Sequence, residues 1–228
     1  MENHRSQHEL FSTILASSVH DIKNTLSTFL ESIKHLRQKP ALSKDQDLQQ
    51  LEFEAIRIHQ GLLQLLVLYK VDQHSFMLAV DEYAAIDLLQ EARAQQQSLL
   101  ELNHLELTLE CANDLMCYCD YQHIGQVLAS MLNNALRHGQ QSVLISAHEQ
   151  DGYCVFSIED DGPGYPPALL IKNWQQPQTA DLTAQRTGLG LYFAVIIASL
   201  HNNAQRQGWI SLDNQSRLGG ARFRLMLP

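Results

Sequence analysis

The 228 residues predict an α+β protein in two parts: an N-terminal helical hairpin that forms a dimeric four-helix bundle, followed by an α/β sandwich. Two observations support this fold class. Apolar residues recur at three- and four-residue steps as far as Val71, which is the period of amphipathic helices. From Phe76 onward, strand-like and helical segments alternate, which is typical of a sheet covered by helices on one face. We place the two domains at residues 1–73 and 74–228.

The hairpin is expected to consist of one helix from about His8 to Gln38 and a second that ends near Val71. Pro40 breaks the pattern between them, and Ser43 is a suitable N-cap for the second helix. The second helix is apolar over more than one narrow face, notably at residues 62–68, so a lone hairpin would bury it poorly. Pairing two hairpins hides this surface, and we therefore expect a homodimer. The alternative is that the hairpin packs on the rest of its own chain.

The second part is expected to contain a linker at 73–75, seven strands and three helices. The strands are expected at 76–80, 105–111, 115–119, 142–148, 153–159, 209–212 and 221–227, and the helices at 83–102, 121–137 and 188–200. Asp120 is placed to cap the middle helix, and Asp151-Gly152 to form a hairpin turn. The polar stretch from Tyr165 to Thr187 has little periodicity, and we expect it to be a mobile lid.

Composition excludes several classes of protein. A formal net charge of −9 argues against nucleic-acid binding, which normally needs a basic face. The chain has no run of eighteen apolar residues and no secretory leader at its start, so we expect no membrane contact and a cytoplasmic location. The four cysteines fit no zinc pattern, and a reduced pair of core side chains is expected at Cys117 and Cys119.

His20 is the candidate nucleophile of the first helix. A neutral imidazole is nucleophilic near pH 7 because its reference pKa is about 6.5. Asp21 follows directly and can take a ring proton, which leaves the other nitrogen free to attack. Asn24 lies one turn further on, where a carboxamide can position a water molecule, and Lys23 can neutralise phosphate charge. Taken alone, the segment is better explained as a polar patch on an exposed helix.

Asn134 is the candidate metal ligand, because an amide oxygen suits Mg²⁺ that also bridges phosphates. Arg137, three residues on, can bond phosphate oxygens, and His138 ends the same helix.

Asp160-Asp161-Gly162-Pro163-Gly164 follows an apolar strand and predicts a nucleotide site. A carboxylate at Asp160 can accept a hydrogen bond from the exocyclic amine of adenine, which guanine lacks at that position. Gly162 and Gly164 allow a close backbone approach. Gly188 and Gly190 open a helix whose N-terminal amides favour phosphate. A calcium loop is excluded because Ile171 and Lys172 stand where later acidic ligands are needed.

These segments together resemble the two-component sensor histidine kinases. His20-Asp21-Ile22-Lys23-Asn24 is similar to the phosphoacceptor box, and Asn134 to the metal-binding residue of the asparagine box, with Arg137 beside it. Asp160 to Gly164 and Gly188 to Leu191 resemble the two glycine boxes. The resemblance covers nearly the whole chain, including the closing strand 219–228.

The resemblance implies a dimerisation and phosphotransfer domain followed by a Bergerat-type ATP-binding domain. It implies that Mg-ATP phosphorylates His20, with Asp21 as general base, and that the phosphoryl group passes to an aspartate of a response regulator receiver domain. Asn24 would serve dephosphorylation of that regulator. The few residues before His20 leave no room for a sensory module, so the expected input is a separate sensor protein, a binding surface on this chain or a sensory region outside this sequence.

Three positions depart from the family pattern. Thr25 stands where proline is usual, Ser130 where a second metal-binding asparagine is usual, and Arg186 where a glycine often precedes the second glycine box. Two other functions therefore stay open. One is a histidine phosphotransferase that needs no ATP, and the other is a phosphatase or scaffold that binds nucleotide without autokinase activity.

Overall fold

The computed structural model describes residues 22, 24–33, 35–36, 38–39, 45–97, 99–100, 105–171, 174, 188–203 and 205–228. The chain divides into two compact units, residues 1–76 and 77–228. Several expectations from the sequence lie outside the described residues: His20, Asp21, Lys23, Ser43 and residues 172–173 and 175–187 of the predicted lid, which include Arg186.

The first unit contains helical backbone at 24–33 and 35–36 and the long helix α2, Gln46–Asp72. Asp45, rather than the expected Ser43, is the N-cap of α2, because its carboxylate accepts a hydrogen bond from the Leu48 backbone N–H at 2.9 Å. Ser27 Oγ lies 3.2 Å from His59 Nε2, which links the two helical segments across the hairpin.

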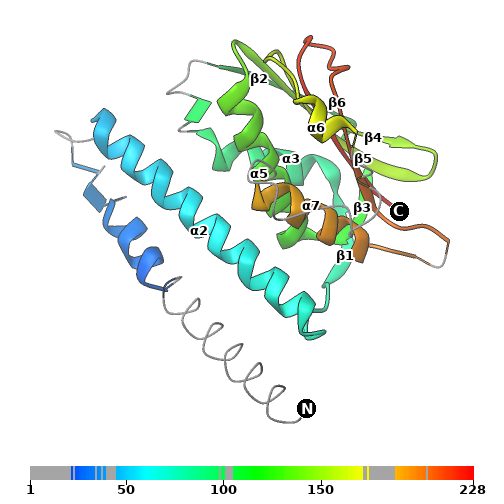
Figure 1. Cartoon of the computed structure of the whole chain (residues 1–228), viewed down its shortest axis with the longest axis horizontal. Coiled ribbons are helices and arrows are strands. Elements are labelled where there is room, and N and C mark those ends of the chain that lie inside the picture. Colours follow the sequence, from blue (N-terminus) through cyan, green and yellow to red (C-terminus); the bar gives the residue numbers. More distant parts are fainter. Residues whose placement is uncertain are drawn as a thin grey trace. The chain divides into compact units, whose positions relative to one another are not determined.

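The second unit is an α/β sandwich (Figure 1). Its strands are β1 Val80–Ala84, β2 Glu106–Cys111, β3 Met116–Asp120, β4 Ser142–Gln150, β5 Tyr153–Asp160, β6 Trp209–Asp213 and β7 Arg222–Leu227. Its helices are α3 Ala85–Gln95, α5 Tyr121–His138, α6 Pro167–Leu170 and α7 Leu189–Leu200. The main sheet has the order β2-β4-β5-β7-β6, with β2 parallel to β4 and the other pairs antiparallel, and β1 pairs with β3 in a separate ribbon.

The core lies between this sheet and the helices α3, α5 and α7, which Figure 1 shows on one side of the strands. Fully buried aromatic side chains fill it from both layers: Phe156 from β5, Phe193 from α7 and Phe223 from β7. The amphipathic pattern of α5 turns Ile124, Val127, Leu128 and Leu132 inward. The polar residues of the same helix therefore remain on its outer side.

Two element boundaries differ from the sequence prediction. The strand expected at 76–80 is β1, Val80–Ala84, because these residues pair in register with β3, Val80 opposite Asp120 and Ala84 opposite Met116. The helix expected from Tyr83 accordingly begins at Ala85, where the ribbon ends. Periodicity did not reveal this ribbon, since its acidic residues are exposed and its stability depends on a partner 36 residues away.

Local turn and core predictions are confirmed. Asp151 and Gly152 both have positive φ, 52° and 74°, as a two-residue hairpin turn between β4 and β5 requires. Cys117 and Cys119 are free thiols at 2% and 0% exposure, so they pack as small core side chains. No helix among the described residues is long and apolar enough to cross a membrane.

The buried side chain of His201 links the end of α7 to Asp120, the residue that ends β3 and caps α5. His201, just after α7, accepts the Asp120 backbone N–H at Nε2 (2.9 Å), so its other nitrogen, Nδ1, donates to the Ile197 carbonyl at 2.8 Å. Asp120 also caps α5 through the His123 N–H. Burial lowers the pKa of His201, with a smaller contribution from His123 in the same direction.

We expect His201 to make the protein lose stability below about pH 6.5, the ordinary value of an unfolded histidine. Below that pH the unfolded chain binds a proton that the folded imidazole does not, so stability falls by at most about 1.4 kcal/mol per pH unit. Urea unfolding between pH 5 and 8 measures the slope. His201→Gln is expected to flatten it, whereas substituting the exposed His35 by Gln should leave it unchanged; equal slopes in all three proteins would contradict the assignment.

Candidate nucleotide-binding site

Asp160 lies at the end of β5 and is 5% exposed. Its Oδ1 accepts two backbone hydrogen bonds, from Gly162 at 2.8 Å and Ala221 at 3.1 Å. Its own carbonyl is held by the Gly220 N–H and the Ser216 hydroxyl. The backbone thus orients the carboxylate through one oxygen, and the other oxygen has no hydrogen-bond partner among the described residues.

Gly162 is required by close packing against α5. A Cβ at this position would lie 2.3 Å from the backbone carbonyl oxygen of His138, which is the last residue of that helix. Gly164 is required by conformation, since its φ is +80°, and by the Asn214 side chain, which would meet its Cβ at 2.7 Å. The structure therefore brings the predicted glycine turn directly onto the end of α5.

Asn134 is half-buried on α5, one turn beyond Ser130. Ser130 faces α7, because a Cβ on Gly190 would stand 2.6 Å from its hydroxyl oxygen. Ser130 and His138 are about 12 Å apart along the helix, so Asn134 lies between the two contacts with glycine segments. The glycine turn at Gly162 and the start of α7 at Gly190, which are far apart in the sequence, therefore both contact α5.

The N-terminus of α7 carries no side-chain cap. Gly188 is its N-cap residue, and within the described residues no side chain caps the first turn. The Leu191 N–H bonds the Gly188 carbonyl at 3.0 Å, and the N–H groups before it together with the helix dipole favour an anion such as a phosphate group at this end. A Cβ added to Gly188 would meet nothing within 4 Å, so this glycine faces open space.

Asp161 has a structural task that its sequence position did not reveal. Its carboxylate accepts hydrogen bonds from the backbone N–H groups of Gln140, Gln141 and Ser142, at 2.7 to 3.2 Å. Desolvation raises the pKa of Asp161, but these N–H donors outweigh it and the net pKa is lowered. The side chain clamps the loop that follows α5, which holds the helix end beside Gly162.

Three other predicted site residues, Arg137, His138 and Asn24, are exposed. Arg137 and His138 end α5 with solvent-accessible side chains, as basic residues at a helix C-terminus favour. Asn24 is exposed on the first helical segment, where its carbonyl accepts a hydrogen bond from the Thr28 hydroxyl. It belongs to the other unit of the chain and is described here by itself.

The loop between β6 and β7 supplies residues that sequence reasoning missed. Asn214 binds both the N–H and the carbonyl of Tyr165, at 2.6 and 3.0 Å. A Cβ on Gly220 would stand 2.6 Å from Asp160 Oδ1, so this loop lies against the carboxylate. The Gly219-Gly220 pair in the sequence indicated only a turn, not that the turn folds back onto Asp160.

The residues of this site fit Mg²⁺ only if a phosphorylated ligand supplies further oxygen ligands. The described residues hold no group of three or more His, Cys, Asp or Glu side chains suited to a metal ion. Magnesium in nucleotide sites usually takes one or two protein oxygens and completes its shell with phosphate oxygens and water. Asn134 offers an amide oxygen of this kind, and Ser130, one turn before it, offers a hydroxyl oxygen that is a weaker magnesium donor.

Residues 119–228 match the protein family described as histidine kinase-, DNA gyrase B-, and HSP90-like ATPase. The second unit is therefore an ATPase domain of this class, and the match includes every predicted nucleotide-site residue from Asn134 to Gly190. ATP binding by this domain is thereby supported.

Curated relatives are sensor histidine kinases. Sensor histidine kinase YkoH of Bacillus subtilis is 29% identical over 191 residues, which cover 80% of this chain and 41% of the relative. Sensor protein PhoQ of Escherichia coli O157:H7 is 23% identical over 227 residues, 99% of this chain and 45% of the relative. Residues 119–228 belong to the ATPase family named above, and the chain as a whole is similar to two-component sensor histidine kinases, although it spans less than half the length of these two relatives.

Solved structures agree on the fold. Acinetobacter baumannii histidine kinase AdeS superposes with a TM-score of 0.60 at 21% identity, covering 91% of this chain and 96% of the AdeS chain. Full-length ShkA in complex with AMPPNP gives a TM-score of 0.62 at 19% identity, covering 95% of this chain and 45% of the other. The Bergerat-type sandwich expected from the sequence is confirmed by this likeness and by the family match.

Proposed function

We propose that the chain is a cytosolic histidine kinase that phosphorylates His20 with Mg-ATP. The observation that carries the proposal is the carboxylate of Asp160, buried at the end of β5 with one oxygen held by the backbone and the other available to a ligand. A fixed acceptor of this kind binds the exocyclic amine of adenine and rejects the carbonyl of guanine. The relatives' names support the kinase assignment.

The phosphate end of the site is assigned to α5 and α7. The uncapped first turn of α7 receives phosphate oxygens beside Gly188 and Gly190, and Arg137 and His138 lie at the end of α5 to contribute positive charge. Magnesium bound by Asn134 would neutralise charge on the phosphates. The His20 ring nitrogen then attacks the terminal phosphorus, the bond to the leaving ADP oxygen breaks, and Asp21 holds the ring proton.

We further propose that the phosphoryl group passes to an aspartate on a response regulator receiver domain. Asn24 is exposed on the helical segment that follows His20, and its amide is suited to orient the water that hydrolyses the regulator's phosphoaspartate. Dephosphorylation would then be a second activity of the same surface.

Exposed apolar side chains support the homodimer. Ile22, Phe29 and Leu36 recur every seven residues, and so do Leu51, Ile58 and Leu65 on α2, all at 37–56% exposure. A heptad stripe on each helix of a hairpin is the pattern that a four-helix bundle buries. The occupant we assign to this face is a second copy of the same hairpin.

A nucleotide-binding phosphatase or scaffold is the second candidate, and Ser130 favours it. A serine hydroxyl is a weaker magnesium ligand than the asparagine usual at this position, which slows phosphoryl transfer more than nucleotide binding.

Labelling with γ-labelled ATP and Mg²⁺ separates the candidates. We expect acid-labile, base-stable label on the wild-type chain and none on His20→Ala, because a phosphoryl group on imidazole nitrogen hydrolyses in acid. His35→Ala, which removes a different histidine that is exposed, should label like the wild type. ATP binding without label would support the phosphatase or scaffold, and absence of both would support a histidine phosphotransferase.

A further inference from the structure

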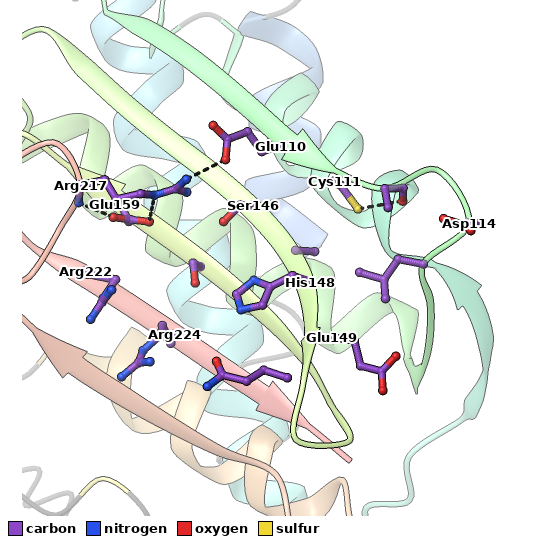
Figure 2. Close-up of a pocket in the computed structure, with 15 residues that line it drawn as sticks. Glu110, Cys111, Asp114, Ser146, His148, Glu149, Glu159, Arg217, Arg222 and Arg224 are labelled. Carbon is purple, nitrogen blue, oxygen red and sulfur yellow. Dashed lines mark hydrogen bonds and ion pairs between the residues drawn. The ribbon is translucent and has the colours of Figure 1, made fainter.

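The face of the main sheet that is turned away from the helices carries a depression of about 750 Å³ (Figure 2). Side chains of β2, β4, β5 and β7 line it, together with Arg217 from the loop between β6 and β7. Arginines gather toward one end in Figure 2, whereas Asp114 and Glu149 lie at the other. No step of the proposed kinase reaction uses this face.

Two serine hydroxyls lie side by side in the depression. Ser146 of β4 and Ser157 of β5 are direct partners in the strand register, and they are 6% and 4% exposed. Neither hydroxyl has a hydrogen-bond partner within the part of the chain that the structure describes. Both side chains line the depression, so these two hydroxyls are available to donate hydrogen bonds to a ligand that enters it.

The buried carboxylate nearby is already satisfied. Both oxygens of Glu159 accept hydrogen bonds from Arg217, from its backbone N–H and its Nε, while Arg217 Nη1 reaches Glu110 at 2.8 Å. Both oxygens of Asp213 are held by Arg222. The carboxylates of Glu159 and Asp213 are therefore fully paired with arginines, and Glu110 is paired through one of its oxygens.

Hydrogen-bond donors without a partner remain at the arginine-rich end of the depression. Arg224 is the register partner of Ser157, and its Nε donates to Ser211 at 3.1 Å with a long second contact to Asp213 at 3.5 Å. Its Nη1 has no hydrogen-bond partner among the described residues, and its side chain is 31% exposed. His148 lies two residues after Ser146 on β4, and its imidazole also lines the depression. The guanidinium group of Arg224 that remains unpaired is therefore a hydrogen-bond donor.

We propose that this depression binds the carboxylate or phosphate group of a small metabolite. The anionic oxygens accept hydrogen bonds from Ser146, Ser157 and the free guanidinium edge of Arg224, which is the planar fork that suits both groups. Asp114 and Glu149 at the far end exclude a second negative charge. The remainder of the ligand is therefore neutral or cationic.

Thermal unfolding of the full chain tests the site, with inorganic phosphate and acetate titrated separately at constant ionic strength. We expect a saturable rise in Tm with at least one of the two anions, and the anion that saturates identifies the group recognised. Ser157→Ala and Arg224→Gln should weaken the apparent Kd by about tenfold or more, as loss of a hydrogen bond to a charged group predicts. Arg93→Gln removes an equal charge from an exposed position on α3 and should have no effect.

Ser157→Ala keeps the test valid if Arg224→Gln unfolds. It removes an unpartnered hydroxyl, so the Tm without added anion should stay level or rise while the response to the anion is lost. A non-saturable response that is equal in all variants would mean an adventitious ion only and would overturn the proposal. So would a saturable response that Ser157→Ala leaves intact, because the anion would then be bound elsewhere, such as at the α7 N-terminus.

Discussion

Asp160→Asn is expected to weaken ATP binding by about 100-fold or more, to below detection in an ordinary binding assay, while the fold and the dimer persist. The asparagine oxygen keeps the hydrogen bonds from Gly162 and Ala221, so the backbone turn survives. The oxygen that faces the ligand becomes an N–H₂ group, which opposes the donor amine of adenine. Losing a charge-assisted hydrogen bond costs roughly 1.5–3 kcal/mol, and each 1.4 kcal/mol is about tenfold in Kd.

Calorimetric titration with ATP and with GTP measures this change, and light scattering measures the mass. Discrimination between the nucleotides should collapse, because the new amide can donate to the guanine carbonyl. ATP binding as tight as in the wild type would show that Asp160 does not contact adenine. Loss of the dimer would show that the domain boundary between residues 73 and 74 is misplaced.

Gly162→Ala is expected to destabilise the ATP-binding domain by roughly 3 kcal/mol or more, at or above the upper end of overpacking effects. Its Cβ would stand 2.3 Å from the His138 carbonyl oxygen and 2.9 Å from the carbonyl carbon. Backbone atoms at the end of α5 have no rotamer to change, and Asp161 holds the adjoining loop in place. The helix end or the glycine turn must therefore move.

Urea unfolding followed by circular dichroism measures this cost, with Gly125→Ala as the matched control. Gly125 lies inside α5, and a Cβ there meets nothing within 4 Å. The control should be stabilised by about 0.5–1 kcal/mol, the ordinary gain of alanine over glycine in a helix. Equal effects of the two substitutions would show that the turn and α5 are not in tight contact.

Local rules were sufficient to predict most elements of the catalytic domain from the sequence. Strict alternation revealed β2, the apolar period revealed α5, and Asp151-Gly152 marked the hairpin between β4 and β5. Each of these signals is contained in a few neighbouring residues. The strand β3 was predicted within one residue, but β1 was misplaced because its pairing with β3 joins residues far apart in the chain, and no local period reports such a partner.

By itself, the sequence determined the chemistry available to the site: a carboxylate at Asp160, an amide at Asn134 and glycines where a ligand must come close. Only the tertiary structure decided how these groups meet, with Gly190 against Ser130, Gly162 against the end of α5 and Gly220 against Asp160. It also decided that two serines share a polar depression on the opposite face of the sheet. The physical reason is that residue type sets what a group can bond, whereas packing across layers sets which groups remain unbonded.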